Sequence, residues 1–140
     1  MHYLEIQAFM VARDAHKDQV DKAGKSYLNH PTFVAGMMDT DEEKAVAWLH
    51  DVVEDTEWTL ERLTANGFPP QVVEAVGVLT HDANVSYGDY IARIKENPLA
   101  RKVKIADLKH NLDLTRLPEV TEKDIERCRK YLDALQQLIS

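Results

Sequence analysis

The six residues from His50 to Asp55 combine one histidine with three acids, directly after the apolar stretch 45–49. Burying ionisable side chains without partners would cost several kcal/mol each, so we expect these groups to have partners. A divalent cation is the simplest one: His50 and Asp51 would bind it, while Glu54 and Asp55 would hold and deprotonate a water molecule. Taken alone, the segment is equally compatible with a helix end whose acids are merely solvated.

A metal ion needs more ligands than this segment supplies, and two other segments offer them. His30 stands at an expected helix start, and Asp107 lies in an apolar helical stretch with Asn111 one turn further on. Taken singly, His30 could be a helix-start residue that bonds to the backbone. Asp107 could be a buried carboxylate paired with Lys104 or Arg116. On the residues alone, these alternatives stay open.

Helical spacing of apolar residues extends over nearly the whole chain and is interrupted by start and stop signals. We find no repeat, no linker and no convincing strand pattern. The sequence therefore predicts an all-α fold, a single domain over residues 1–140 with seven or eight helices. The expected helical segments are 4–20, 31–38, 39–55, 59–65, 70–79, 87–96, 99–114 and 121–138.

Composition excludes several classes of protein. The chain has 140 residues and a net charge of −7, from 24 acids and 17 bases, which argues against binding a nucleic-acid polymer but not against a small anion in a local basic pocket. No apolar run approaches the roughly 20 residues that span a bilayer, and no signal peptide is recognisable. The single cysteine, Cys128, suits a reducing compartment. We therefore expect a cytoplasmic protein without a membrane partner, and leave homo-oligomer formation open.

Together, segments 30–31, 50–56 and 104–112 resemble the HD-superfamily hydrolases, and more narrowly the RelA/SpoT-type hydrolase domain in its short, stand-alone form. The resemblance extends in order over nearly the whole chain. It implies that His30, His50, Asp51 and Asp107 bind one divalent ion, typically Mn²⁺. Two imidazoles and two carboxylates agree with a six-coordinate ion of this kind better than with a closed structural zinc site.

The same resemblance implies a reaction, the removal of the 3′-pyrophosphate from guanosine tetraphosphate or pentaphosphate. Glu54 and Asp55 would orient and deprotonate the attacking water, and Asn111 would hold the sugar or phosphate region of the nucleotide. Arg127 and Tyr131 lie four residues apart on the last expected helix and match the phosphate-binding pair of the family. The competing interpretation of Arg127 is a surface ion pair with an acidic neighbour, worth little energetically.

The sequence departs from the family at one substrate contact. A basic pair is expected where this chain has Asp21 and Lys22, so the arginine that would stack on the base is absent. Lys22 remains a candidate phosphate contact, with a solvated loop lysine as the alternative. Because an aspartate cannot stack on a purine as a guanidinium does, guanine preference is open. The alternatives are a phosphohydrolase for an adenosine alarmone or a phosphorylated dinucleotide cofactor, and a non-catalytic nucleotide or metal sensor.

Overall fold

The computed structural model describes residues 2–21 and 23–140, which form nine α-helices, one short 3₁₀ helix and no strand. The expected all-α architecture is confirmed. None of these helices combines the length and the hydropathy of a membrane-crossing segment. The elements are α1 (Tyr3–His16), α2 (Asn29–Gly36), α3 (Asp41–Leu49), α4 (Val52–Asp55), α5 (Leu60–Ala65), α6 (Pro70–Leu79), α7 (Tyr87–Lys95), α8 (Pro98–Asn111), η1 (Leu114–Arg116) and α9 (Glu122–Ile139).

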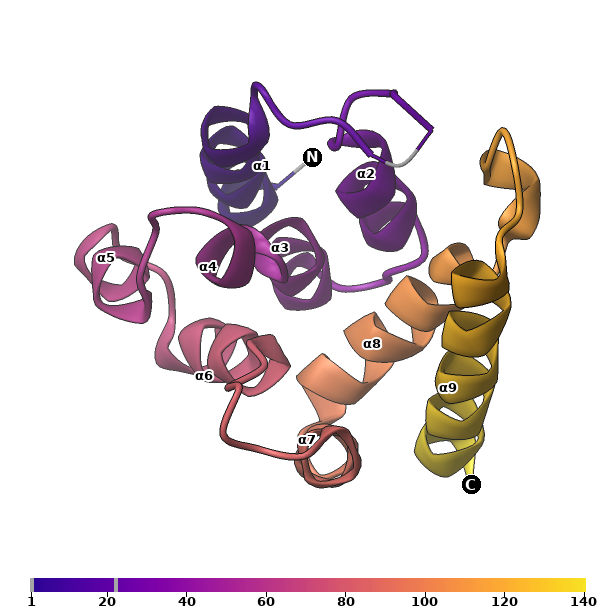
Figure 1. Ribbon diagram of the computed structural model, residues 1–140. Coiled ribbons are helices and arrows are strands. Elements are labelled where there is room, and N and C mark those ends of the chain that lie inside the picture. Colours follow the sequence, from indigo (N-terminus) through magenta and orange to yellow (C-terminus); the bar gives the residue numbers. More distant parts are fainter. Residues whose placement is uncertain (1, 22) are drawn as a thin grey trace.

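Helices α3 and α8 form the centre of the molecule (Figure 1). Helix α3 packs against α1, α2, α6 and α8, and its residues 45–49 are all buried. A helical segment that is apolar on every side, as residues 45–49 are, has to be enclosed in this way. Helix α8 contacts α2, α3, α6, α7 and α9, so that it joins the N-terminal half of the fold to the C-terminal half.

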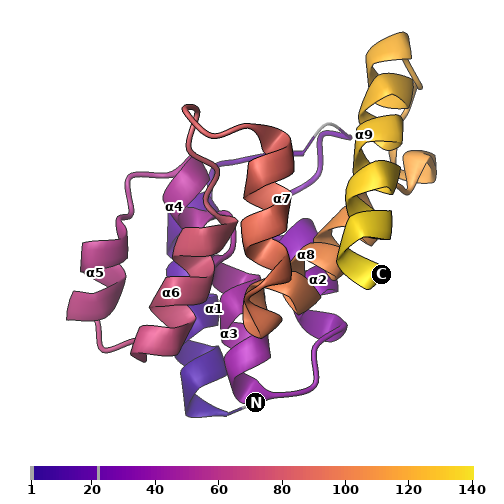
Figure 2. The ribbon, with the colours of Figure 1, turned by 90° about the horizontal axis from the view of Figure 1, so that it is seen from below.

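Helix α9 lies at one side of the molecule, along α7 and α8 (Figure 2). It buries Ala134 and Leu138 against them, while Leu132 and Ile139 stay exposed. Its N-terminal half is thereby held beside the C-terminal end of α8, the part of α8 that carries Asp107.

Local capping interactions define the starts of five helices. The side chains of Thr40, Thr59, Ser86, Asn97 and Thr121 each accept a hydrogen bond from a backbone N–H in the following turn. Such a cap satisfies a donor that the helix itself leaves unpaired, and typically contributes about 1 kcal/mol. These starts depend only on residues close in sequence.

The expectation that residues 39–55 form one helix is wrong. Helix α3 ends at Leu49, and Asp51 has φ −107° and ψ −1°, away from helical values, before α4 begins at Val52. On a straight helix, neighbouring side chains point about 100° apart. The turn at Asp51 instead lets His50 and Asp51 face one common point.

Two other helices are shorter than expected. Helix α1 ends at His16 rather than near residue 20, and the N–H of Gln19 bonds to the His16 carbonyl as the chain turns away. Helix α8 ends at Asn111 rather than Leu114, because the side chain of Asp113 accepts a hydrogen bond from the N–H of Thr115 and starts η1.

Candidate metal centre

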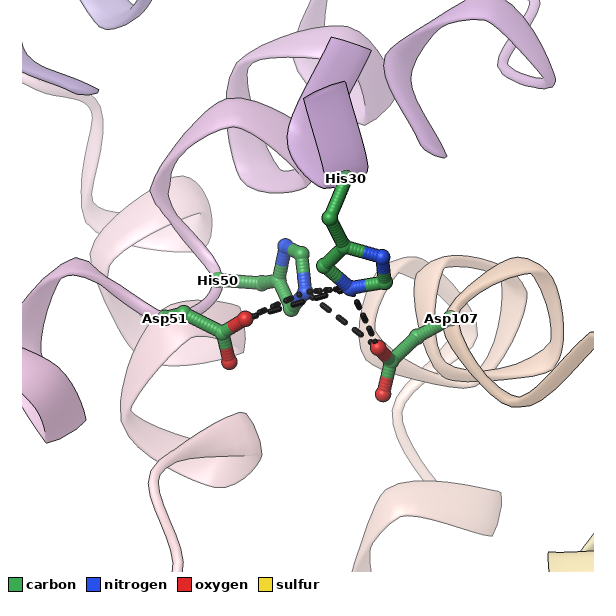
Figure 3. Close-up of side chains that lie close together, drawn as sticks. All are labelled: His30, His50, Asp51 and Asp107. Atoms are coloured by element: carbon green, nitrogen blue, oxygen red, sulfur yellow. Dashed lines mark hydrogen bonds and ion pairs between the residues drawn. The ribbon is translucent and has the colours of Figure 1, made fainter. Parts of the chain in front are cut away.

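Four side chains from three separate segments meet at one point. The ligating atoms of His30, His50, Asp51 and Asp107 all lie within 4.8 Å of one another (Figure 3). His30 comes from the first turn of α2, His50 and Asp51 from the turn between α3 and α4, and Asp107 from α8. Three of the four are buried, and Asp51 is half-buried. The structure thus brings together the residues for which the sequence predicts metal binding; the binding itself stays a prediction.

Short distances join these side chains. The Nε2 atoms of His30 and His50 are 3.3 Å apart, and His50 Nε2 lies 3.1 Å from Asp51 Oδ2. His30 Nε2 lies 2.7 Å from Asp107 Oδ1, although the two residues are 77 positions apart in the sequence. The Nδ1–H of His50 donates to the carbonyl of Ala47 at 2.6 Å. Because that proton is held at Nδ1, Nε2 of neutral His50 carries a lone pair that points into the cluster.

The charges of the cluster suit a cation. Burial alone would raise the pKa of Asp51, but the neighbouring His50 outweighs it and holds that pKa at about 2. Burial alone would lower the pKa of His50, and the carboxylates of Asp51 and Asp107 raise it well above its usual value. Without a metal, a proton on the His50 imidazole therefore compensates the carboxylates of Asp51 and Asp107. A divalent ion could replace that positive charge with the same nitrogen and oxygen donors.

Asp107 is held by further partners on its own helix. The Lys104 ammonium lies 2.9 Å from Asp107 Oδ2, and the Asn111 amide donates to Oδ1 at 3.0 Å. Burial opposes the ionisation of Asp107, but Lys104 and the two histidines hold its pKa well below the usual range. From the sequence, Lys104 and Arg116 are both possible partners of Asp107. In the structure Asp107 pairs with Lys104, whereas Arg116 lies 3.7 Å from Asp21.

Glu54 and Asp55 lie beside the cluster on the wall of a cavity. Glu54 Oε1 accepts a hydrogen bond of 2.7 Å from the backbone N–H of His81. The Tyr27 hydroxyl donates to Asp51 and lies 3.5 Å from Asp55 Oδ2. Partial burial, followed by the charges of Asp51 and Glu54, raises the pKa of Asp55 to about 6. A carboxyl group of that pKa can exchange a proton near neutral pH.

The cavity has a volume of about 400 Å³, within the range of small-molecule sites. Asn111, Arg127 and Tyr131, three of the expected nucleotide contacts, line it together with His30, Asp51 and Asp107 of the cluster. Lys22, the fourth expected contact, lies outside the described residues. Arg127 forms an ion pair with Asp124, which also lines the cavity, so this pair forms part of the cavity wall.

Two residues at the site have no role assigned from the sequence. Tyr27 bonds to Asp51, and the buried His110 places its Nδ1 2.7 Å from Nδ1 of His30. The signal for His110 is its position three residues after Asp107, which puts both on one face of α8. Tyr27 has no comparable local signal, since its partner Asp51 lies 24 residues away.

Comparison with known sequences finds relatives among bacterial alarmone enzymes, although no family model matches the chain. The chain is 33% identical over 147 residues to a probable GTP pyrophosphokinase of Mycobacterium leprae, covering 94% of this chain and 18% of that protein. It is 33% identical over 126 residues to a probable guanosine-3′,5′-bis(diphosphate) 3′-pyrophosphohydrolase of Synechocystis, covering 79% of this chain and 16% of that protein. The chain thus spans less than a fifth of these relatives.

A shorter and more similar region appears in Escherichia coli. There the bifunctional (p)ppGpp synthase/hydrolase SpoT is 46% identical over 59 residues, 39% of this chain and 8% of SpoT. Among solved structures, a metazoan ortholog of SpoT that hydrolyses ppGpp superimposes with a TM-score of 0.77 over 99% of this chain and 86% of that chain. At 22% identity this likeness establishes the fold. The fold, the sequence relatives and the residue cluster agree, and the chain is related in sequence to the RelA/SpoT-type alarmone enzymes.

Proposed function

We propose that this chain uses one divalent ion, Mn²⁺, to hydrolyse the 3′-pyrophosphate of guanosine tetraphosphate or pentaphosphate. The observation that carries the proposal is the cluster of His30, His50, Asp51 and Asp107, whose ligating atoms lie within 4.8 Å of one another beside a cavity. Relatives named for this reaction support it.

The donor set fits a manganese-like ion. His30 and His50 would supply imidazole nitrogens, and Asp51 and Asp107 would supply carboxylate oxygens, a mixture that suits Mn²⁺. When bound, such an ion lowers the pKa of coordinated water and neutralises phosphate charge. Lys104 keeps Asp107 ionised, and the carbonyl of Ala47 keeps Nε2 of His50 directed inward, so the protein orients these donors in advance.

Asp55 is the proposed general base, and Glu54 is the proposed partner that orients the water. The Asp55 pKa of about 6 leaves most of its carboxylate ready to take a proton at neutral pH. The hydrogen bond from the His81 backbone holds Glu54 in one orientation. In the reaction the water oxygen bonds to the phosphorus attached to the 3′ oxygen. The bond from that phosphorus to the 3′ oxygen breaks, and the 3′ oxygen takes up a proton as pyrophosphate leaves.

The phosphates would be bound from α8 and α9. Arg127 can present two parallel N–H donors to a phosphate, and Tyr131 adds a hydroxyl four residues further along the same helix. The Arg127 partner, Asp124, would then share the guanidinium with the substrate. The Asn111 side-chain N–H donates to Asp107. Its second N–H and its amide oxygen would contact the sugar or phosphate of the substrate. For Lys22, the proposed phosphate contact rests on its place in the sequence alone.

Asp21 favours a second candidate function, the same chemistry on a different nucleotide. Its Oδ1 accepts hydrogen bonds from the N–H groups of Ala23 and Lys25 at 2.9 and 3.0 Å, and its Oδ2 lies 3.7 Å from the Arg116 guanidinium. The residue therefore shapes a loop at the cavity and cannot stack on a purine base. An adenosine alarmone or a phosphorylated dinucleotide cofactor is the alternative substrate.

A nucleotide panel tests both candidates. Protein with Mn²⁺ is incubated with guanosine tetraphosphate, its adenosine counterpart and a phosphorylated dinucleotide, and released pyrophosphate and phosphate are measured separately. We expect pyrophosphate from guanosine tetraphosphate. We also expect its release to fall to background in Asp51→Ala but not in Asp133→Asn, an exposed acid on α9 away from the cavity.

Other outcomes redirect the proposal. Phosphate release from the dinucleotide alone would replace the alarmone substrate with the second candidate. Asp21→Arg would then be compared with Asp21→Asn, which removes the charge but keeps an acceptor for the loop. Binding of metal and nucleotide without any turnover would make the protein a sensor and would sink the enzymatic proposal.

A further inference from the structure

Both ring nitrogens of His30 face residues of α8. On one edge, Nε2 lies 2.7 Å from Asp107 Oδ1 and points into the cluster (Figure 3). On the opposite edge, Nδ1 lies 2.7 Å from Nδ1 of His110. Because Asp107 and His110 are three residues apart, one face of α8 reaches both sides of the same imidazole. His30 and His110 are both buried, so this contact is shielded from water.

Two ring nitrogens at 2.7 Å can share only one proton. If both nitrogens carried a hydrogen, the two hydrogens would collide. If neither nitrogen carried one, their lone pairs would repel each other. One nitrogen must therefore donate and the other accept. For His30 to bind a cation through Nε2, that atom needs its lone pair, and the ring proton must then be on Nδ1. Nδ1 of His30 is consequently the donor, and Nδ1 of His110 has to be the acceptor.

We propose that His110 is a positioning residue that accepts the Nδ1 proton of His30 and thereby keeps Nε2 of His30 free to bind a divalent cation. The inference rests on the metal site of the proposed function but not on its nucleotide. Ligand histidines commonly have such an outer partner, and its loss typically weakens metal binding about 10- to 100-fold. Here the partner is a second imidazole instead of a carboxylate or a carbonyl.

His110 is itself held in place. Its ring stacks on Phe33 with centroids 4.1 Å apart and planes 12° apart, and Phe33 lies one turn after His30 on α2. The backbone carbonyl of His110 also accepts a hydrogen bond of 3.1 Å from Arg116. The ring therefore has little freedom to turn Nδ1 away from His30.

The two ligand histidines differ in a way that makes His110 important. The Nδ1–H of His50 faces the Ala47 carbonyl, which can only accept, so its tautomer is determined by the backbone. At Nδ1 of His30 the structure places His110 instead of a carbonyl. This partner can either donate or accept, and only an accepting His110 is compatible with a metal ligand at Nε2.

Two substitutions separate hydrogen bonding from packing. His110→Phe keeps a ring to stack on Phe33 but removes the acceptor. His110→Asn removes the ring but leaves an amide oxygen near the position of Nδ1. Mn²⁺ affinity is measured by calorimetry on the full chain, and the unfolding free energy is measured with a chelator present. We expect His110→Phe to weaken Mn²⁺ binding about 10- to 100-fold, and His110→Asn to stay within about threefold of the wild type because an acceptor remains.

A spectroscopic measurement adds a readout that packing alone would not change. In protein loaded with diamagnetic Zn²⁺, ¹⁵N chemical shifts should report His30 protonated at Nδ1 in the wild type and in His110→Asn. His2→Phe serves as the control, because His2 is exposed at the start of α1 and does not line the cavity. This variant should keep wild-type Mn²⁺ affinity even if its unfolding free energy falls.

Several results would overturn the inference. Equal Mn²⁺ affinity in the wild type and His110→Phe would do so, as would a loss in His110→Asn as large as that in His110→Phe. A wild-type chain that binds no divalent cation would remove the metal site and this inference together. Absence of alarmone hydrolysis, with the affinities as expected, would remove only the proposed substrate.

Discussion

Replacing Lys104 by methionine tests whether the cluster is built to hold a cation. Lys104 lies 2.9 Å from Asp107, and the side chains of the two residues are 14% and 7% exposed. Removing one partner of a buried ion pair typically costs about 3–5 kcal/mol, because the other charge stays buried without compensation. Asp107 keeps the Asn111 amide and the two histidines as partners. We therefore expect a loss near the lower end, about 3 kcal/mol, in metal-free protein.

A bound divalent cation should reduce that loss. The ion would bring positive charge to Asp107 from the side of the cluster, so Lys104→Met should gain more unfolding free energy from Mn²⁺ than the wild type does. Stabilisation by a ligand grows with its concentration relative to the dissociation constant, about 2.7 kcal/mol at a hundredfold excess over that constant. Urea unfolding at neutral pH, with either Mn²⁺ or a chelator, measures both effects.

Lys102→Met is the matched control on the same helix. Lys102 pairs with Asp39 and Glu43 but is 37% exposed, and exposed pairs contribute only about 0–1 kcal/mol after solvent screening. Its loss should be small and independent of Mn²⁺. The reasoning is refuted if Lys104→Met is no more destabilising than Lys102→Met, or if Mn²⁺ leaves the difference between them unchanged.

Two further predictions concern a titration and a helix cap. In metal-free protein, ¹³C NMR of the Asp55 carboxyl should give a pKa of about 6, raised by partial burial and by the charges of Asp51 and Glu54. Since the folded pKa lies above the unfolded one, this group adds stability as pH falls from about 6 to about 4. Asp55→Asn should remove that part of the pH dependence, and an unshifted Asp55 would contradict the assignment. Thr40→Ala should lower the free energy of unfolding in urea by about 1 kcal/mol, because it removes the Thr40 hydroxyl that accepts from the N–H of Glu43 in the capping box. No measurable loss would show that the cap contributes nothing.

The helices were predictable wherever their signals are local. Thr59, Ser86 and Thr121 cap helices that begin at or within one residue of the expected starts, and α6 begins at Pro70 as expected. Each of these starts depends on a side chain and a backbone group within three residues. The break at Asp51 has no such signal, since no glycine, proline or capping side chain precedes it.

That break is stabilised from far along the chain. The Tyr27 hydroxyl bonds to Asp51, and the His81 backbone bonds to Glu54, 24 and 27 residues away in the sequence. These contacts exist only once the segment before α2, the turn into α4 and the segment after α6 have packed together. Helical periodicity, which describes a segment in isolation, therefore predicted a continuous helix.

The sequence by itself determined the all-α class, most helix starts and the residue types that could bind a metal ion, because periodicity, caps and side-chain chemistry are local properties. Only the tertiary structure decided that His30, His50, Asp51 and Asp107 share one point. It also decided that Asp107 pairs with Lys104 and that His110 reaches His30. Distances of a few ångströms between residues up to 80 positions apart depend on how the helices pack, and the sequence pattern carries no direct measure of that packing.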